Sequence, residues 1–396
     1  MRRLHSRLDD EFMARALRLA RRGEGVTSPN PCVGAVLVHM GRIVGKGWHR
    51  AAGQPHAEVE AIQAARKAGR EVRGGILYVT LEPCSTWSRT PPCTDIILAH
   101  GLRRVVVGAT DPNPVHRGAG FRRLQKTGVE VTAGVLREEC LELNRAWNYW
   151  IVHKTPWVIA KCAMSLDGKI ATRAGESRWI TGKAAREAAH RLRNRVDAIL
   201  VGVETVLKDD PALTIRLPKP SVRQPIRVVL DTHARTPPEA RILGDAPRRE
   251  VSSLPKRMRG RTAREMAGPK GEAWVIVGRR APLARIRRLE ARGARVWPVG
   301  TVDGRVSVKV VLRLLGKLGV TALLVEGGGE VLGSFAQHKA IHEVAFFVAP
   351  VIIGGIESVR AVAGEGVRRW MDSIKLVGTR VGRVGSDLIV RGRVDR

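Results

Sequence analysis

Short apolar runs alternate with helical stretches along this chain, and this alternation restricts it to α/β architectures. Val33 to Val38 and Ile43 to Trp48 are strand-like, and Met40-Gly41 between them predicts a hairpin. The continuous apolar run Ile76 to Leu81 predicts a buried strand. His56 to Ala68 has a helical pattern that ends at Gly69. The first part of the chain is therefore expected to be a mostly buried sheet covered by helices.

Further elements of this part follow from capping and periodicity. Asp10 is expected to cap a helix that Gly23 closes, with an apolar face of Phe12, Met13, Leu17 and Ala20. A helix over Thr94 to His100 and a strand over Val105 to Gly108 come later. Leu136 to His153 is predicted to be a helix that passes into a linker ending at Pro156.

A second α/β series begins after this linker. Helical stretches are expected between most of its strands, for instance over Lys183 to Arg195. Its expected strands are Trp157 to Ala163, Ala198 to Gly202, Ile226 to Asp231, Trp274 to Gly278, Thr321 to Glu326 and Val344 to Val348. A chain of 396 residues also exceeds what one hydrophobic core normally supports. We therefore predict two domains, over residues 1–150 and 151–396.

The charge is the unusual feature of the composition. Lys and Arg number 69 against 37 Asp and Glu, a formal net charge of +32 that would attract nucleic acid. Aromatic residues are only 4%, however, and arginines occur in every segment instead of one stripe. The densest basic stretch, Arg241 to Lys270, holds several Pro and Gly and is expected to be an exposed loop. We therefore expect solvated surface charge and no nucleic-acid partner.

The cysteine count and the beginning of the chain indicate the compartment. Five cysteines do not make a disulfide framework, and they fit a reducing compartment. The first residues contain no apolar segment of a secretory signal, and no apolar run approaches the ~20 residues that cross a bilayer. These features predict a cytoplasmic protein without a membrane partner.

The most specific motif joins one histidine and two cysteines. His56, Cys84 and Cys93 make a three-ligand zinc set whose fourth position is left for water, as in catalytic zinc sites. Zinc lowers the pKa of that water toward ~7. Glu58 is not needed as a ligand, and a carboxylate beside the metal can carry protons from water to a leaving amine. The motif therefore predicts a zinc-dependent deaminase.

The spacing of His56 and Glu58 sets a geometric condition. Residues two apart on a regular helix point roughly 200° away from each other. Both side chains can face one cleft only if His56 stands at the helix start, and Gln54-Pro55 before it favours this. Cys93 follows Pro91-Pro92 ahead of another helix, and a helix N-terminus stabilises a thiolate.

A glycine run marks the second half. Gly327-Gly328-Gly329 lies between the strand Thr321 to Glu326 and a predicted helix over Val331 to Phe335. Glycines at such a junction let backbone N–H groups approach a phosphate, although a tight turn without ligand explains this run equally well. The Gly-x-Gly-x-x-Gly fingerprint is missing, which disfavours a standard Rossmann domain.

Many short motifs surround the proposed zinc ligands. They are Ser28-Pro29-Asn30-Pro31, Val33-Gly34, Gly47-Trp48-His49, His56-Ala57-Glu58-Val59, Thr80-Leu81-Glu82-Pro83-Cys84-Ser85, Arg89-Thr90-Pro91-Pro92-Cys93 and Asp111-Pro112-Asn113-Pro114. With eight residues between the two cysteines, this set resembles the bifunctional deaminase/reductase family of riboflavin biosynthesis. The resemblance implies a cytidine-deaminase-like three-layer α/β/α domain followed by a dihydrofolate-reductase-like α/β domain.

The resemblance also implies roles for individual residues of the first domain. His56, Cys84 and Cys93 would hold Zn²⁺, and Glu58 would be the proton donor. Asn30, His49, Asp111 and Asn113 would line the pocket for a diaminopyrimidinone ribosylamine 5′-phosphate. One stretch departs from the family, which usually has a histidine and a glycine where this chain has Thr86 and Ser88, on either side of Trp87. We expect the deaminase to work, with an altered rate or affinity.

The second half carries the reductase motifs of the same family. They are Lys161, Ala163, Ser165-Leu166-Asp167-Gly168-Lys169, Ser177, Trp179-Ile180-Thr181, Thr205, Asp209-Asp210-Pro211, Leu213-Thr214, Arg216, Gln224-Pro225-Ile226-Arg227 and Val325-Glu326-Gly327-Gly328. The resemblance implies that NADPH reduces a ring-opened ribose at C1′ to a ribityl chain. It implies that NADPH is bound by Ala163, Trp179, Thr205, Asp209 and a loop of seven residues, which are Gly328, Gly329, Glu330, Val331, Leu332, Gly333 and Ser334. It also implies that the sugar phosphate is contacted by Ser177, Arg193, Leu213, Arg216 and Glu326. For Arg193 alone, a solvated helix face is an equally good explanation.

Two other functions stay open at this point. The first is an RNA base deaminase with an appended basic domain, suggested by zinc and the net charge, which predicts strongly salt-dependent RNA binding. The second is a reductase joined to an inactive deaminase domain, suggested by Thr86. The family resemblance also implies a homo-oligomer.

Overall fold

The computed structural model describes residues 6–87, 91–218, 223–244 and 271–395. The chain divides into two compact units, Met1–Lys154 and Thr155–Arg396. The boundary expected between residues 150 and 151 falls inside helix α6 (Arg145–His153) of the first unit. Ser88 and most of the basic stretch 241–270 lie outside the described residues.

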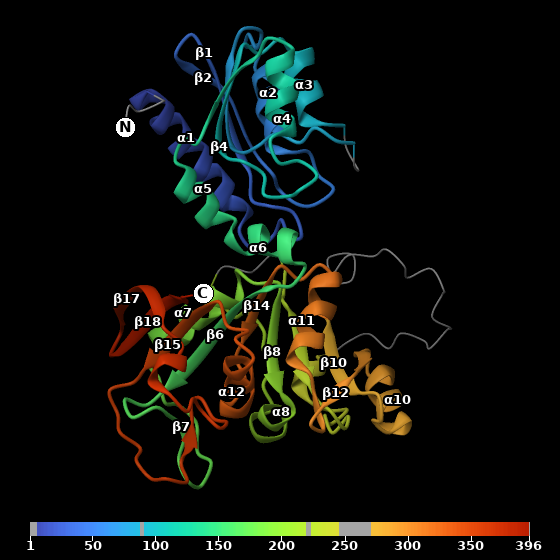
Figure 1. The fold of residues 1–396 in the computed structure, drawn as a ribbon, viewed down its shortest axis with the longest axis vertical. Helices are drawn as coiled ribbons and strands as arrows, with labels where there is room; N and C mark the ends of the chain where they lie inside the picture. Colours follow the sequence, from blue (N-terminus) through green and yellow to red (C-terminus); the bar gives the residue numbers. More distant parts are fainter. Residues whose placement is uncertain (1–5, 88–90, 219–222, 245–270, 396) are drawn as a thin grey trace. The chain divides into compact units, whose positions relative to one another are not determined.

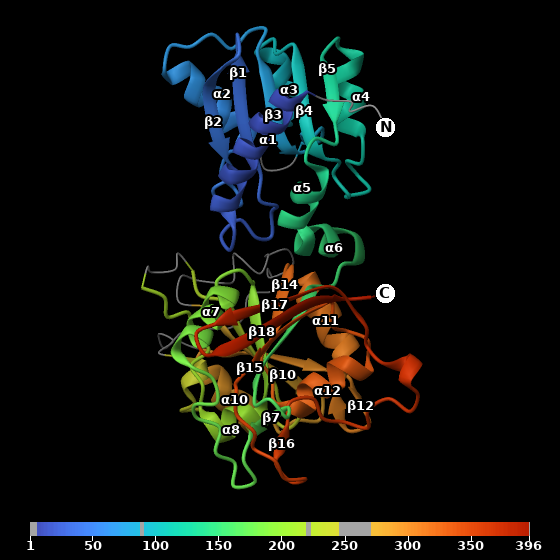
Figure 2. The same cartoon turned by 90° about the vertical axis from the view of Figure 1, so that its left-hand side faces the viewer.

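The first unit is a mixed five-stranded sheet between two helical layers (Figures 1 and 2). The strand order is β2-β1-β3-β4-β5, with β1 antiparallel to β2 and β3 and the other pairs parallel. Its strands are β1 (Gly34–His39), β2 (Arg42–Trp48), β3 (Ile76–Leu81), β4 (Arg104–Ala109) and β5 (Glu130–Ala133). Its helices are α1 (Arg7–Ala20), η1 (Arg21–Gly23), α2 (Ala57–Lys67), α3 (Cys93–Ala99), α4 (Ala119–Lys126), α5 (Arg137–Leu143) and α6.

Two apolar clusters hold these layers together. One joins α2, α3 and α4 to one face of the sheet through side chains such as Ile62, Ile97 and Leu124. The other joins α1 and α5 to the opposite face through Met13 and Cys140. Side chains of a strand alternate between the two faces, so each strand contributes to both clusters. The predicted covered sheet is confirmed.

Three predictions of local structure need correction. Helix α1 begins at Arg7, because Ser6 and Asp9 form a capping box, and Asp10 is not the cap. The stretch from Leu136 to His153 forms two helices separated at Asn144. The sequence-based description also lacked α4 and β5. The hairpin is confirmed, with positive φ angles of 47° and 73° at Met40 and Gly41.

The second unit is built on a sheet of nine strands in its described part. The order is β11-β10-β9-β8-β14-β6-β15-β18-β17, parallel up to β15 and antiparallel in the last two pairs. The strands of this sheet are β6 (Trp157–Met164), β8 (Ala198–Gly202), β9 (Ile226–Leu230), β10 (Ala273–Gly278), β11 (Arg295–Val299), β14 (Ala322–Val325), β15 (Glu343–Val348), β17 (Leu376–Val384) and β18 (Asp387–Val394).

Helices and short pairs complete this unit. The helical segments are α7 (Lys183–Arg193), α8 (Val203–Asp209), η2 (Arg241–Leu243), α10 (Leu283–Ala291), α11 (Val308–Lys317), α12 (Gly329–Gln337) and η3 (Trp370–Asp372). Two small sheets pair β12 (Thr301–Val302) with β13 (Arg305–Val306) and β7 (Lys169–Ala171) with β16 (Val359–Arg360). The largest core cluster packs α11 and α12 on one sheet face, with Phe335 and Trp274 fully buried. All six predicted strands are present, and the structure adds β11 and the C-terminal β17–β18 hairpin to this sheet.

Candidate functional site

His56, Cys84 and Cys93 converge in the first unit. One ligand atom of each lies within 4.8 Å of the other two. His56 Nδ1 is 3.2 Å from Cys93 Sγ and 3.6 Å from Cys84 Sγ. Tetrahedral zinc with the usual Zn–N and Zn–S bond lengths separates such ligand atoms by about 3.5–3.8 Å. The donor set and its spacing therefore fit zinc, with Nδ1 as the imidazole ligand atom.

Local backbone structure brings these ligands together. His56 is the N-cap of α2, with the extended backbone angles φ −73° and ψ 163°, as the His56–Glu58 spacing requires. Cys93 is the first residue of α3, and its backbone N–H donates to Cys84 Sγ at 3.3 Å. Such a donor stabilises a thiolate. The hydrogen bond therefore favours a Cys84 ligand ready to bind a cation.

Glycines let strand β2 approach the helix that carries His56. A Cβ atom on Gly47 would lie 2.3 Å from the Ala57 carbonyl oxygen, and one on Gly45 would lie 2.0 Å from that of Ala61. Both contacts are with helix backbone, which cannot rotate away. The position of α2, and with it that of His56, therefore depends on these two glycines.

We expect Gly47→Ala to lower the thermal midpoint of the first unit and its zinc content together. Overpacking of this kind costs about 1–3 kcal/mol, and α2 must shift to relieve it. Calorimetry and metal analysis measure the two effects. Gly300→Ala is the control, because no atom lies within 4 Å of a Cβ placed there. Full zinc occupancy in a normally stable Gly47→Ala variant would contradict this account.

Glu58 lies beside the three ligands and is only 3% exposed. Burial raises the pKa of its carboxyl group, and the nearby Cys84 adds to this effect. Hydrogen bonds from Cys93 and His56 lower the pKa of Cys84 to about 4, against the effect of burial. The shared hydrogen bond and burial raise the pKa of Cys93. The site thus combines a thiolate ligand with a buried carboxyl group that can hold a proton.

The residues expected to line the pyrimidine pocket form two groups. His49 Nδ1 donates to the Pro55 carbonyl at 3.1 Å, which leaves Nε2 to accept from Asn30 Nδ2 at 3.0 Å. The His49 ring stands edge-on to His56, with centroids 5.3 Å apart. Asp111 Oδ1 accepts from the Asn113 backbone N–H, and burial raises the Asp111 pKa to about 6. Asn30 and His49 therefore form the group that lies directly against the metal ligands.

Glu82 is a residue of this site that the sequence-based prediction did not assign. It is 4% exposed, and its carboxylate accepts backbone N–H groups of Asp111, Gly118 and Gly120. Glu82 therefore fixes the loop that carries Asp111. The sequence feature that could have identified Glu82 is its position, two residues before Cys84 and directly after a buried strand.

The loop that departs from the family pattern is only partly described. Trp87, three residues after Cys84, is 73% exposed. Arg123 donates to the Ser85 carbonyl at 3.3 Å and pairs with Asp95 of α3. These contacts anchor the start of the loop before Thr86.

A buried ionic cluster lies at the carboxyl end of β14 in the second unit. Glu326 accepts from Arg193 Nε at 2.6 Å, from Arg193 Nη2 at 3.0 Å and from Lys161 Nζ at 3.3 Å. Burial alone would raise the Glu326 pKa, but the charges of Arg193 and Lys161 outweigh it and hold that pKa well below its usual range. Arg193 also donates to the Thr214 carbonyl, so the solvated-face explanation for Arg193 is wrong.

Lys161 was recognised as a motif residue but was given no role. Its side chain is 15% exposed, and its ammonium group pairs with Glu326, 165 residues away in the chain. Strand β6 carries Lys161 between β14 and β15. The pairing of β6 with β14 brings these two residues together.

The glycine run begins helix α12 directly after this cluster. Gly328 is its N-cap, and the first N–H groups of a helix have no acceptor within the helix. A Cβ on Gly328 would lie 3.6 Å from Thr205 Oγ1. The segment that follows β14 is therefore next to helix α8, which follows β8. This arrangement suits a cofactor phosphate.

Not all residues assigned to this cofactor loop can contact a ligand through their side chains. Leu332 belongs to the core, and the Ala363 carbonyl covers the position where Gly333 would carry a Cβ. The Glu330 carboxylate pairs with Arg305, and Val331 packs over Gly202 and Gly327. The Arg360 carbonyl likewise covers the position where Gly329 would carry a Cβ, so Gly328 and Ser334 remain as backbone or small polar positions.

The other predicted reductase residues lie in the same unit. Ser177 Oγ donates to Asp209 Oδ1 at 3.3 Å. Trp179 is 69% exposed, and the Arg186 guanidinium stacks 4.3 Å from its ring centroid. Ala163 is in β6, Leu213 is buried and Arg216 is exposed. The side chain of Arg216 makes no ion pair with an acid of the described residues.

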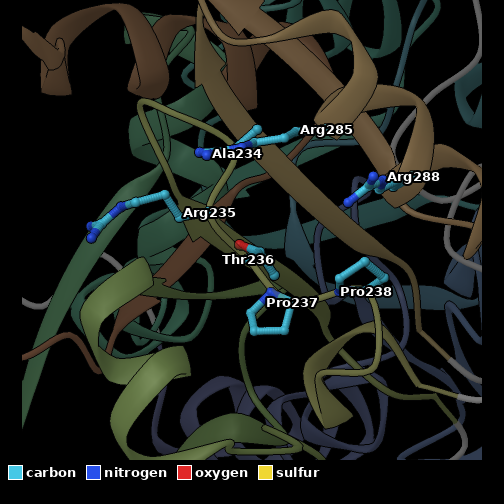
Figure 3. Close-up of a pocket in the computed structure, with 7 residues that line it drawn as sticks. All are labelled: Ala234, Arg235, Thr236, Pro237, Pro238, Arg285 and Arg288. Carbon is cyan, nitrogen blue, oxygen red and sulfur yellow. The ribbon is translucent and has the colours of Figure 1, made fainter.

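A cavity of about 270 Å³ lies elsewhere in this unit, between the Ala234–Pro238 segment and α10 (Figure 3). Its lining includes Arg235, Arg285 and Arg288, whose side chains spread apart in this view. Arg235 pairs with Glu204, and Arg285 donates to the His233 carbonyl. No residue predicted for either site lines this cavity.

Comparison with known proteins finds a family match for each of the two units. Residues 6–109 match the zinc-binding region of cytidine and deoxycytidylate deaminases, and residues 156–390 match the RibD C-terminal domain. Among the described residues, no helix is long and apolar enough to span a membrane. Fold and sites therefore define a two-domain enzyme, a zinc deaminase joined to an NADPH-dependent reductase.

The chain belongs to the riboflavin biosynthesis protein RibD family. It is 39% identical to the RibD protein of Bacillus amyloliquefaciens over 96% of this chain and 95% of that protein. An Acinetobacter baumannii RibD structure has a TM-score of 0.81 at 30% identity, covering 98% of this chain and 99% of that one. A diaminohydroxyphosphoribosylaminopyrimidine deaminase/5-amino-6-(5-phosphoribosylamino)uracil reductase from Thermotoga maritima has a TM-score of 0.79 at 35% identity, with the same coverage.

Proposed function

We propose that the first unit deaminates 2,5-diamino-6-ribosylaminopyrimidinone 5′-phosphate and that the second unit reduces its ribosyl group to ribityl with NADPH. The observation that carries the proposal is the convergence of His56, Cys84 and Cys93 beside a buried carboxyl group. Bifunctional deaminase–reductases act in riboflavin biosynthesis, and this chain matches the family over both units.

In the deaminase, each residue has a distinct task. Zinc, when bound, supplies hydroxide at neutral pH by lowering the pKa of water toward ~7. Glu58 accepts a proton at its carboxylate oxygen and delivers it to the amine nitrogen that leaves as ammonia. Its burial and raised pKa suit a group that is protonated for part of the cycle. Asn30 and His49 would hold the pyrimidine ring beside these groups.

In the reductase, the ionic cluster orients the substrate. NADPH, when bound, supplies the hydride. Glu326 already accepts three hydrogen bonds, and a carboxylate has about four acceptor sites, so one remains for a sugar hydroxyl. All three Arg193 nitrogen atoms bond to protein groups, so we assign Arg193 to positioning Glu326. The phosphate is left to the unpaired Arg216.

We also propose a cytoplasmic homo-oligomer that binds no nucleic acid. None of the five cysteines forms a disulfide, which fits a reducing compartment. Size-exclusion chromatography with light scattering tests the oligomer. Salt-dependent RNA binding at physiological ionic strength would contradict the proposal that the protein binds no nucleic acid.

One assay tests both activities. The diaminopyrimidinone ribosylamine phosphate is supplied with NADPH, and ammonia release and NADPH loss are followed together. We expect a chelator to stop ammonia release, while NADPH loss continues if the deaminated pyrimidine is supplied. Ammonia without NADPH loss would refute the reductase. A zinc-loaded protein that releases no ammonia would support an inactive deaminase domain.

A further inference from the structure

His190 lies on the substrate side of α7. It precedes Arg193 by three residues, and residues three apart share one face of a helix. Since Arg193 bonds to Glu326, this face is turned toward the ionic cluster. The charges that act on His190 are those of Arg193, Arg216, Glu326 and Lys161. His190 therefore belongs to the reductase site, although it has no role in the proposed function described above.

A single hydrogen bond sets the tautomer of the His190 ring. The backbone N–H of Arg216 donates to Nδ1 at 3.3 Å. A ring nitrogen that accepts carries no proton, so the proton of the neutral ring is on Nε2. The half-buried ring makes no other hydrogen bond with the described residues. An N–H donor is therefore left for a ligand.

The surrounding charge indicates what that ligand is. Burial and the charges of Arg193 and Arg216 lower the pKa of His190 to about 4, so the ring is neutral at pH 7. The charges of Arg193 and of exposed Arg241 act on Arg216, whose side chain has no acidic partner among the described residues. A neutral donor beside the Arg216 guanidinium, which has no acidic partner among the described residues, suits a phosphate and excludes a cation.

We propose that His190 is a further substrate-binding residue of the reductase, donating from Nε2 to the 5′-phosphate beside Arg216. This inference rests on the proposed reductase activity. It assigns His190 to affinity for the phosphate and not to the hydride step, because the imidazole is oriented by the backbone of the residue that would bind that phosphate.

The test compares His190→Leu with His190→Gln, which retains an N–H donor. The substrates are 5-amino-6-(5-phosphoribosylamino)uracil and the same compound without phosphate. For His190→Leu we expect KM for the phosphorylated substrate to rise about tenfold, the size of one hydrogen bond to a charged group. We expect kcat to stay within about twofold and His190→Gln to stay within about threefold of the parent KM.

The dephosphorylated substrate separates phosphate binding from a structural role. Parent and His190→Leu should use it equally well, and inorganic phosphate should inhibit the parent more strongly than the variant. Equal losses on both substrates, an unchanged KM or a loss confined to kcat would overturn the proposal. Arg287→Ala, on an exposed face of α10, is the control for a substitution outside the site and should leave both KM values unchanged. If His190→Leu melts early, His190→Ala repeats the measurement.

Failure of this inference is distinct from failure of the proposed function. If the parent protein does not oxidise NADPH with the phosphorylated substrate, the reductase assignment itself is wrong. If the parent does so and the variants behave alike on both substrates, only the role of His190 is refuted.

Discussion

Glu58→Gln should abolish ammonia release while the protein retains zinc and oxidises NADPH with deaminated substrate. Glu58 is assigned to proton transfer only, and the three metal ligands are other residues. Loss of a positioned acid–base group costs about 10²–10⁴-fold in rate. Ammonia production, metal content and NADPH absorbance measure the three parts of this expectation.

Glu60→Gln is the matched control for that variant. Glu60 is on the same helix, pairs with Arg50 and is not one of the three metal ligands. We expect it to keep ammonia release within about twofold, because a partly exposed ion pair contributes little stability. If Glu58→Gln loses its zinc, Glu58 holds the metal and the assignment to proton transfer is wrong.

Glu326→Gln should cost the reductase at least a hundredfold in kcat/KM and leave ammonia release intact. The substitution leaves Arg193 and Lys161 buried without a compensating charge. Breaking a buried pair in this way typically costs about 3–5 kcal/mol of stability. NADPH turnover and a calorimetric midpoint for the second unit test both effects. Glu357→Gln, which removes an exposed pair with Arg173, is the control.

The stability difference between Glu326→Gln and its parent should depend on pH. The pKa of Glu326 in the folded protein is lowered from its ordinary value of 4.5. Its contribution is therefore fully present above that value and is lost as pH falls through the lower folded pKa. The two unfolding free energies should differ most near neutral pH and approach each other in acid. A difference that grows in acid would contradict the assignment.

Much of the fold and of the zinc site was predictable from local sequence. The strand Ile76 to Leu81 is observed with the predicted bounds, because a continuous apolar run between turn residues has few alternatives. His56 had to stand at a helix start for Glu58 to share its cleft, and it is the N-cap of α2. Errors arose where capping was ambiguous, as at Asp10, or where a helix was interrupted, as at Asn144.

What the sequence by itself determined is the kind of chemistry and the order of the secondary structure, because ligand types and periodicity are local properties of the chain. The tertiary structure alone decided which charges meet. Arg193 and Glu326 are 133 residues apart, and no pattern distinguishes this arginine from the others of its helix. Their contact depends on α7 packing against a sheet in which β14 lies between β6 and β8. The same packing brings the Arg216 backbone to His190, because long-range contacts follow from strand order and not from spacing along the chain.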